Sequence, residues 1–501
     1  MRAWFAGDFE DCLALCERVR PDGIEMRSEI ALLRARALLR VARPQEAIDV
    51  VRSVFVAHGT LDASLTARML LGQAYVRLGD AERGLAILEE ARGASAAAHP
   101  TIRSEIALGI ALAHYGVRRL DEAERALDEV SPDADIVHAR ALEYRAWIAA
   151  ARSDYAQATE HFRAVLQRLD ACRHRDRFLE ANATFGLAAF TAERLDRQGW
   201  LIVEHRRARI EWSGSALNGL QSVIALAASK MYDIDGRVRE ALQAAREAEA
   251  VAPNAGYALL AQCRRAAVFR LAGERFAHAD AAARLRDALD ALDPAAWRDT
   301  AQHNLLLAVA EEVAYAGDVL SARALLKRYA ELPASPLFSL SGNTIETALR
   351  AFVEAVIADV EGAYGVAHRH YRDAFRLFAK VGYERRALLT ALRLGELTGH
   401  AYLFEYVDHA LRKLAHGSPL RERGRRMNPE LNDPVLTALS LPERSVLKLL
   451  CDGKTTREIA SARRRSAQTI RNTVSRILRA FAVPDRAALV RECVRRGIAQ
   501  L

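Results

Sequence analysis

The first 416 residues repeat one pattern of hydrophobic and polar positions. A segment rich in Ala and Leu is followed by a short break, often Gly-Asp, and then by a second segment with Ala early and Leu late. Clear examples begin at Leu70, Ala141 and Leu305. Because the apolar residues recur with helical spacing on both sides of a turn signal, each example predicts two helices joined as a hairpin.

The breaks between the paired helices recur at intervals of roughly 33 to 44 residues, which indicates stacked helical hairpins. They lie near Asp8, Arg43, Asp80, Leu120, Asp154, Asp196, Gly236, Gly273, Gly317 and Glu361. Small residues such as Gly72 and Ala74 should let one helix approach its partner closely. The pattern resembles tetratricopeptide repeats (TPRs), so residues 1–416 are expected to form an all-α, TPR-like α-solenoid. The first break comes after only six residues, so the solenoid either starts with half a repeat or begins upstream.

A solenoid of this kind presents a concave groove suited to a protein or a small-molecule effector. Large aromatic side chains are candidates for its lining, although wedging between hairpins is their commoner use. These candidates are Trp147, Tyr155, Trp200, Trp212, Tyr257 and Trp297. Nothing in the sequence identifies the effector.

Residues 439–498 change to four short helical segments. Pro442 lies at the start of the first, and Gly453 is a plausible left-handed cap at its end. The second carries the capping-box pattern, with Thr455 at the cap and Glu458 three residues later. A third runs from residue 467 to 480, and the last opens at Asp485 and is expected to stop at Gly497.

The third of these helices separates an apolar stripe from a polar, basic face. Ser466 is a natural N-cap. The apolar residues share one face: Ile470, Val474, Ile477, Leu478 and Phe481. Arg471, Asn472, Ser475 and Arg479 project elsewhere. Since Arg can pair with guanine and Asn with adenine in the major groove, this pattern predicts a helix-turn-helix whose third helix reads DNA.

The four-helix segment resembles the DNA-binding domain of LuxR-type transcription regulators. The matching residues agree in order and spacing: Leu439, Ser440, Glu443, Val446, Leu447, Gly453, Glu458, Ile459, Ala460, Ser466, Thr469, Ile470, Ile477, Val483 and Arg486. The resemblance implies base contacts by Arg471, Asn472 and Ser475. It also implies contacts with the DNA backbone, which we assign to Thr455, Ser466, Thr469, Arg476 and Arg479.

Three positions depart from the LuxR pattern. Arg463 and Arg465 stand where the family usually has buried aliphatic residues, and Thr473 replaces a common His. Since unpaired Arg side chains are costly to bury, both arginines are expected to reach the surface or meet phosphate. The geometry of the turn before Ser466 is therefore left open by the sequence.

Charge is concentrated in the same region. Residues 417–501 hold 18 Lys and Arg against 8 Asp and Glu, a net charge of +10, whereas the whole chain carries +8. Such a basic segment is the electrostatic footprint expected of a protein that binds phosphate. Residues 417–435 are rich in Pro, Gly, Asn and Arg and are interpreted as a linker, so the helix-turn-helix domain is expected at residues 436–501.

The sequence shows no pattern typical of metal binding, cofactor binding or catalysis. The six cysteines are scattered without zinc-site or disulfide spacing, so no metal or cofactor is expected. Carboxylate pairs such as Glu89-Glu90 and Glu311-Glu312 are interpreted as solvated helix faces. No catalytic constellation can be built, so we expect no enzymatic activity. Without a signal peptide or an apolar span, the protein is expected in the cytoplasm.

The sequence therefore predicts a DNA-binding transcription regulator. The expected partners are double-stranded DNA, RNA polymerase, an effector in the repeat groove and a second copy of the chain in a homodimer. The resemblance implies a dimer contact around Leu489, Val490 and Cys493, with packing inside the domain as an equal alternative. The other hypothesis is a helical-repeat interaction scaffold without DNA-binding activity.

Overall fold

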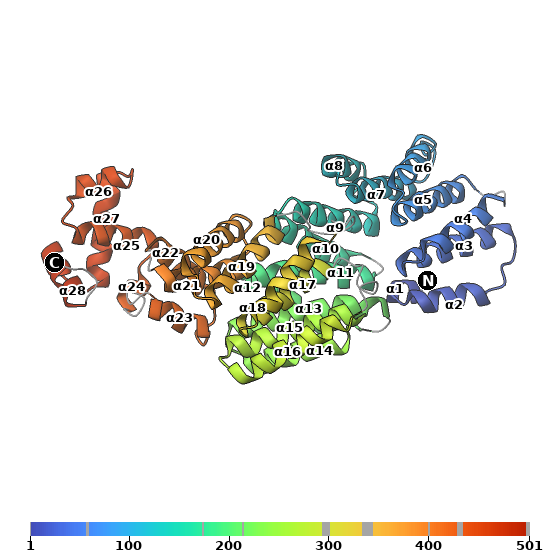
Figure 1. Cartoon of the computed structure of the whole chain (residues 1–501). Coiled ribbons are helices and arrows are strands. Elements are labelled where there is room, and N and C mark those ends of the chain that lie inside the picture. The colour runs from blue at the N-terminus through green and yellow to red at the C-terminus, as the bar shows by residue number, and fades with distance from the viewer. Residues whose placement is uncertain are drawn as a thin grey trace. The chain divides into compact units, whose positions relative to one another are not determined.

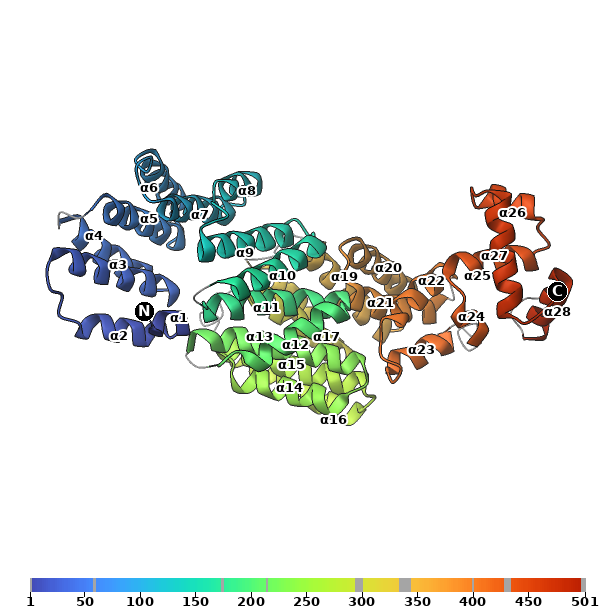
Figure 2. The ribbon, with the colours of Figure 1, turned by 180° about the vertical axis from the view of Figure 1, so that it is seen from behind.

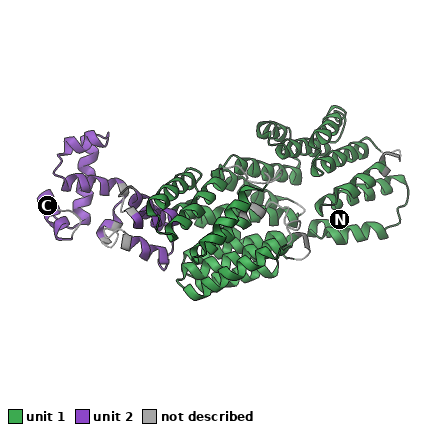
Figure 3. Cartoon of the chain, in the orientation of Figure 1, with its two compact units in different colours: residues 1–387 green, residues 388–501 purple. Residues whose placement is uncertain are grey.

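A computed structural model describes residues 2–56, 60–172, 175–212, 215–292, 301–332, 344–398, 401–427 and 434–496, and every regular element in these ranges is an α-helix. The chain divides into two compact units, residues 1–387 and residues 388–501 (Figure 3). Helix α21 (Glu384–Thr398) crosses this division.

The helices of the first unit appear in two views in Figures 1 and 2. They are α1 (Arg2–Ala6), α2 (Phe9–Arg18), α3 (Ile24–Arg40), α4 (Pro44–Val56), α5 (Leu61–Arg77), α6 (Ala81–Gly93), α7 (Pro100–Gly116), α8 (Leu120–Asp128), α9 (Asp135–Ala151), α10 (Tyr155–Ala171), α11 (Arg177–Arg194), α12 (Arg197–Arg209), α13 (Ser215–Ile234), α14 (Val238–Ala250), α15 (Ala255–Leu271), α16 (Arg275–Asp290), α17 (Ala301–Tyr315), α18 (Val319–Ala330), α19 (Thr344–Val360) and α20 (Tyr364–Lys380).

These helices pair into antiparallel hairpins, as the repeats predicted. Nine of the ten expected breaks lie between the two helices of a hairpin, from the turn between α1 and α2 to the turn between α19 and α20, and Leu120 is the first residue of α8. The first helix of a hairpin also packs against the first helix of the next, as α3 does against α5 and α5 against α7. The TPR-like α-solenoid is therefore confirmed in the described part of the chain.

A local code at the hairpin turns explains this agreement. Gly79 adopts a left-handed φ of +91°, and the amide of Asp80 donates to the carbonyl of Tyr75 at 3.0 Å. The Asp80 carboxylate then accepts from the amide of Arg83 at 3.2 Å and caps α6. The same capping recurs at Asp8, Asp154, Asp196 and Asp318. Glycine and aspartate at these points stop one helix and start the next.

The solenoid turns back on itself within the first unit. Helix α1 lies beside α11 in both views (Figures 1 and 2). The rings of Phe9 and Phe178 meet edge to face with centroids 5.4 Å apart. The Arg40 guanidinium lies 4.9 Å from the Phe178 ring centroid. Segments about 170 positions apart thus share one packed layer. This places α1, α3, α5, α7 and α9 around a partly open space.

Helices α5 and α6 approach each other closely at a pair of glycines. A Cβ atom on Gly72 would lie 2.6 Å from Leu88 Cγ and 2.9 Å from the carbonyl oxygen of Gly84. The backbone oxygen cannot rotate away as a side chain can. The sequence prediction that Gly72 permits close packing is therefore confirmed.

We expect Gly72→Ala to destabilise the first unit by about 1–3 kcal/mol through overpacking, which exceeds the gain of up to about 1 kcal/mol from helix propensity. Gly93→Ala is the matched control, since a Cβ there meets nothing within 4 Å. Chemical denaturation followed by far-UV circular dichroism measures both changes. Equal midpoints for Gly72→Ala and Gly93→Ala would show that the approach is not tight.

A network of buried charges lies inside the repeats, where the sequence predicted solvated faces. Glu311 and Glu312 are only 4% and 3% exposed. Arg270 donates to Glu312 through two nitrogens, at 3.0 and 2.8 Å, and His278 lies 3.0 Å from the same carboxylate. Arg386 binds Glu311 at 2.8 Å. The interpretation of Glu311-Glu312 as a surface pair was wrong, because helices distant in sequence bring arginines onto both carboxylates.

The network continues through a second set of buried residues. Asp233 on α13 pairs with Arg264 on α15 and with Arg385 on α21, the latter at 3.3 Å. Lys230 binds Glu193 at 2.7 Å. The start of α21 is thus held to the repeats by ion pairs that water scarcely reaches.

The second unit holds the rest of α21 and seven further helices among its described residues. They are α22 (Ala401–Arg412), α23 (Pro419–Met427), α24 (Pro434–Ala438), α25 (Leu441–Cys451), α26 (Thr456–Ala462), α27 (Ala467–Ala480) and α28 (Arg486–Arg495).

Part of the predicted linker, residues 417–435, is helical. Helix α23 packs on α22 and buries Leu420 to 4% exposure, while Gly424 leaves room for Leu411. A helix was not expected because the segment has few apolar residues: Leu420 is buried, but the other buried positions in its described part are Ser418 and Gly424. We retain as a proposal the predicted domain bounds of 1–416, 417–435 and 436–501. The division into compact units falls elsewhere, after residue 387.

Helix α22 also contacts the helices that follow the linker. Arg412 donates to the carbonyl oxygen of Leu439 at 3.0 Å. Arg444 on α25 binds Asp408 on α22 at 2.8 Å, and the Asp408 side chain is 8% exposed. These bonds tie α25 to α22 within the second unit.

Candidate nucleic-acid interface

Helices α24 to α28 surround a small hydrophobic core that sets the position of α27. The buried members of the core are Leu436, Leu439, Val446, Leu447, Leu450, Ile459, Ala460, Ile470, Val474, Ile477, Phe481, Leu489 and Cys493. Helices α24 to α28 supply these side chains together with Leu439 and Phe481, and α27 contributes only one of its sides to the core. Its other side is free to carry polar residues.

Helix α26 begins with the capping box that the sequence predicted. The amide of Thr455 donates to Glu458 Oε2 at 2.6 Å, and the amide of Glu458 donates to Thr455 Oγ1 at 3.3 Å. A hydrogen bond from the Thr455 amide helps to lower the pKa of the Glu458 carboxyl, so the cap holds a charged carboxylate. A second capping box, which the sequence reading missed, joins Ser440 and Glu443 at the start of α25.

The turn between α26 and α27 is tight and left-handed. Arg464 has a φ of +49°, and the amide of Arg465 donates to the carbonyl of Ala460 at 2.9 Å. Arg463 and Arg465 are exposed, as the cost of burying them predicted. The departure from the LuxR pattern therefore leaves the sharp bend intact and adds positive charge beside the start of α27.

The start of α27 is capped by Ser466. Its Oγ accepts from the amide of Thr469 at 3.1 Å and lies 2.8 Å from Thr469 Oγ1. Thr473 is buried, and its hydroxyl donates to the carbonyl of Thr469 at 3.0 Å. A Thr where the family commonly has His is thus accommodated within the helix itself.

The outer face of α27 carries the residues predicted to contact bases. Arg471, Asn472, Ser475 and Arg479 are exposed, and Ile470, Val474 and Ile477 on the other side are buried. The stripe that the sequence predicted on this helix is confirmed. Exposed guanidinium, amide and hydroxyl groups on one helical face are the groups that read base edges.

Comparison with known families assigns this domain. Residues 437–493 match the model described as "Bacterial regulatory proteins, luxR family". The chain contains a LuxR-type helix-turn-helix domain. The protein is a DNA-binding transcription regulator with TPR-like repeats. No curated protein matches the chain.

Three solved structures that match the chain do so at low sequence identity. A Rap protein complexed with competence and sporulation factor has 10% identity and a TM-score of 0.49, covering 80% of this chain and 99% of its own. The human IFIT1 dimer with PPP-AAAA has 12% identity and a TM-score of 0.41, covering 85% and 94%. Cut9-Hcn1 has 12% identity and a TM-score of 0.29, covering 93% and 89%. Likenesses at this level say nothing of what the chain binds.

The LuxR-type domain also exposes one residue that the sequence reading missed. Gln468 lies one turn before Asn472, and its Nε2 donates to Asn472 Oδ1 at 3.1 Å. Both side chains are exposed at the start of α27. The spacing of four residues could have revealed the pair, since such residues are neighbours on a helix.

The predicted backbone contacts of the LuxR-type domain are all exposed: Thr455, Ser466, Thr469, Arg476 and Arg479. Arg476 is also engaged within the domain, because its Nε lies 3.3 Å from Glu443 Oε1. This contact joins α27 to the capping box of α25. Arg476 thus carries a positional role in the free protein, beside the role toward phosphate that we predicted.

Helix α28 closes the LuxR-type domain. Asp485 caps it by accepting from the amide of Ala488 at 2.8 Å, and Arg486 Nη2 donates to the carbonyl of Lys454 at 2.6 Å. Leu489 and Cys493 are both 0% exposed in the core. The alternative of packing inside the domain therefore holds for these two residues, and they cannot serve as a dimer contact. The predicted stop at Gly497 lies outside the described residues.

The aromatic residues proposed for the repeat groove mostly pack within the solenoid. Tyr155 and Trp200 are buried to 1% and 4% exposure. Trp147 meets the ring of Phe162 edge to face at 5.0 Å. Trp212 donates its indole N–H to the carbonyl of Arg207 at 3.2 Å. These four wedge hairpins together, Tyr257 is half-buried, and Trp297 lies outside the described residues.

No helix among the described residues is long and apolar enough to span a membrane. The six cysteines, all within the described ranges, are free thiols. Burial raises the pKa of the Cys12 thiol to about 11, in keeping with its place in the hydrophobic core.

Proposed function

We propose that α27 enters the major groove of promoter DNA and reads base edges with Arg471, Asn472 and Ser475. The observation that carries this proposal is the exposed polar face of α27 opposite its buried stripe, directly after the tight turn at Arg464. Gln468 joins the reading face, since Gln and Asn both match the donor and acceptor pattern of adenine.

The DNA backbone is held by groups around this face. Thr455, Ser466 and Thr469 lie at helix starts, where amides and hydroxyls bind phosphate. Arg476 and Arg479 supply charge, and the net charge of +10 in residues 417–501 supports the same role. Arg476 would exchange Glu443 for a phosphate on binding.

The remaining parts of the proposal concern partners. The repeats bind a protein, peptide or small-molecule effector that controls presentation of the LuxR-type domain. RNA polymerase and a second copy of the chain are further proposed partners, and binding takes place in the cytoplasm, where bacterial promoters are. No enzymatic step is assigned to the chain.

The test is selection of bound fragments from genomic DNA by the full-length protein. We expect a shared sequence among the selected fragments and retardation of those fragments in a gel. The alternative, an interaction scaffold without DNA-binding activity, predicts no enrichment above a column without protein. That outcome would overturn the proposed function.

A further inference from the structure

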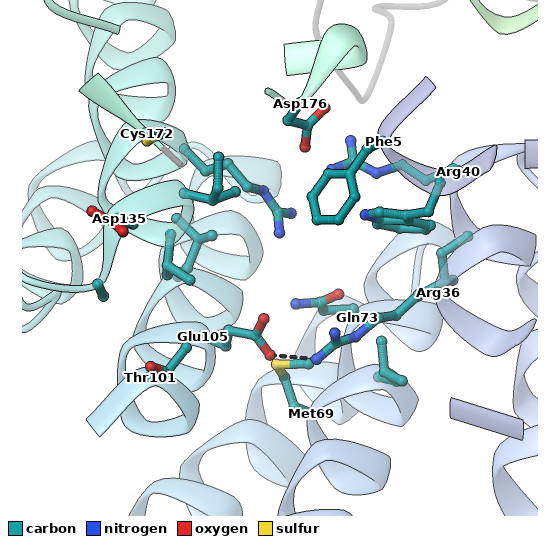
Figure 4. Close-up of a pocket in the computed structure, with 18 of the residues that line it drawn as sticks. Phe5, Arg36, Arg40, Met69, Gln73, Thr101, Glu105, Asp135, Cys172 and Asp176 are labelled. Atoms are coloured by element: carbon teal, nitrogen blue, oxygen red, sulfur yellow. Dashed lines mark hydrogen bonds and ion pairs between the residues drawn. The ribbon is translucent and has the colours of Figure 1, made fainter. Parts of the chain in front are cut away.

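The first turn of the solenoid lines a partly open cavity of about 390 Å³ in the first unit (Figure 4). Its walls come from α1, α3, α5, α7 and α9, together with residues 172 and 176 that precede α11. Asp176 and Phe5 face Glu105 and Met69 across the open space in Figure 4. The volume is that of a typical small-molecule site, roughly 300–1,000 Å³.

Four arginines line the cavity, and three of them form no ion pair with the residues that the structure describes. Arg36 binds Glu105 at 2.6 Å. Arg40 and Arg140 form no ion pair with any residue that the structure describes. Arg77 donates one nitrogen to the carbonyl of Leu39 at 2.9 Å and likewise forms no ion pair there.

The acidic groups near the cavity are mostly engaged elsewhere. Asp176 accepts from the amide of Leu179 at 2.9 Å as the cap of α11. Asp135 pairs with Arg168 at 3.1 Å, and Glu143 accepts from Asn182. Asp133 is exposed. These carboxylates lower the local potential, but none of them binds the three arginines.

The charges of Arg40 and Arg140 also favour an anion in the cavity. Burial and the positive charge of Arg140 lower the pKa of Arg40 to about 10. Burial acts to lower the pKa of Arg140 as well, but Tyr144 and the carboxylates of Glu105 and Glu143 outweigh it and raise that pKa, so Arg140 keeps its charge. Arg40 and Arg140 therefore repel each other. An anion between them would remove this repulsion and supply the hydrogen-bond acceptors that their guanidinium groups lack.

The rest of the wall is apolar and aromatic. Trp4 and Phe5 come from α1, while Met69 and Leu108 come from α5 and α7. The guanidinium of Arg40 lies 5.9 Å from the Trp4 ring centroid. A ligand with an apolar body would thus bury it here while its charged end meets the arginines.

We propose that this cavity binds a small organic anion, an oxyanion group on an apolar or aromatic body, through Arg40, Arg77 and Arg140. The inference rests on the proposed role of the repeats as the effector-binding region and names the chemistry of the effector. The bound body would contact Trp4 and Phe5, so binding would also stabilise α1 against α11.

The test titrates full-length protein with two fluorescent probes that differ in one group. 8-Anilinonaphthalene-1-sulfonate carries an oxyanion, and N-phenyl-1-naphthylamine has the same aromatic body without charge. We expect Arg140→Gln and Arg77→Gln each to raise the dissociation constant of the sulfonate by about 10- to 100-fold. The uncharged probe should bind both variants as it binds the wild type.

Arg246→Gln is the control, because Arg246 is exposed on α14 and forms no ion pair with the described residues. Arg77 is exposed as well, so Arg77→Gln should retain the fold even if Arg140→Gln does not. Unchanged sulfonate affinity in a folded Arg77→Gln variant, or an equal loss with Arg246→Gln, would overturn the proposal. Selection of genomic DNA by the same proteins is scored separately, so a failure of the cavity is distinguished from a failure of DNA binding.

Discussion

The double variant Arg471→Ala/Asn472→Ala should lose about 2–6 kcal/mol of specific DNA-binding free energy, or roughly 30-fold to 10⁴-fold in affinity, because each bidentate contact with a base contributes about 1–3 kcal/mol. Both side chains are exposed on α27 and make no contact with the hydrophobic core. Alanine is a strong helix former, so α27 should persist. Fluorescence anisotropy with a selected DNA fragment measures the loss.

Arg491→Ala provides the control for the reading face. Arg491 is an exposed arginine on α28 of the same domain, away from the predicted contacts. Its removal lowers the net charge by one without touching α27. If the double variant and Arg491→Ala bound the selected fragment equally well, the assignment of Arg471 and Asn472 as base readers would be wrong.

Glu312→Ala should destabilise the repeat unit by about 3–5 kcal/mol, the cost of leaving buried charges without their partner. Arg270 donates to this carboxylate through two nitrogens, and His278 lies within hydrogen-bond distance of it. Both residues lose this buried partner in the variant. Burial acts to raise the pKa of Glu312, but the charge of Arg270 and the hydrogen bond to His278 outweigh it and lower the pKa to about 2.

The sign of this pKa shift sets the pH dependence. A carboxyl whose pKa is lower in the folded protein contributes stability above its unfolded pKa, and that stability is lost as protons bind the folded form. For Glu312 the loss should fall between about pH 4.5 and pH 2. The Glu312→Ala variant should show a shallower decline in stability over that window.

Glu90→Ala is the matched surface variant. Glu90 also pairs with an arginine, Arg68 at 2.9 Å, but its side chain is 68% exposed. Exposed ion pairs contribute only about 0–1 kcal/mol. Denaturant midpoints that shift equally for Glu312→Ala and Glu90→Ala would contradict the account of a buried network.

The features that could be predicted from the sequence are those that depend on residues close together along the chain. Asp80 beside Gly79 and Thr455 with Glu458 each define a helix end within a few positions, so hairpin turns and the start of α26 could be predicted. The stripe of α27 is equally local. Each of these signals operates within one or two helical turns, which is why they appear in a single sequence.

The missed features depend on distance along the chain. Glu311 reaches Arg386 across 75 positions, and Asp233 reaches Arg385 across 152. A carboxylate on a helix looks the same in the sequence whether water or an arginine from another repeat meets it. The cavity likewise forms only because α1 packs against α11, and no pattern of neighbouring residues predicts that contact.

The salt dependence of DNA affinity tests the central claim most directly. Full-length protein bound to a selected fragment is titrated at monovalent salt from about 50 to 200 mM. With Arg476 and Arg479 on phosphates, the slope of log affinity against log salt should be about −1.8 per domain or steeper, and Arg479→Ala should make it shallower by about 1. A slope near zero, unchanged by Arg479→Ala, would contradict a LuxR-type domain that holds DNA through its phosphates.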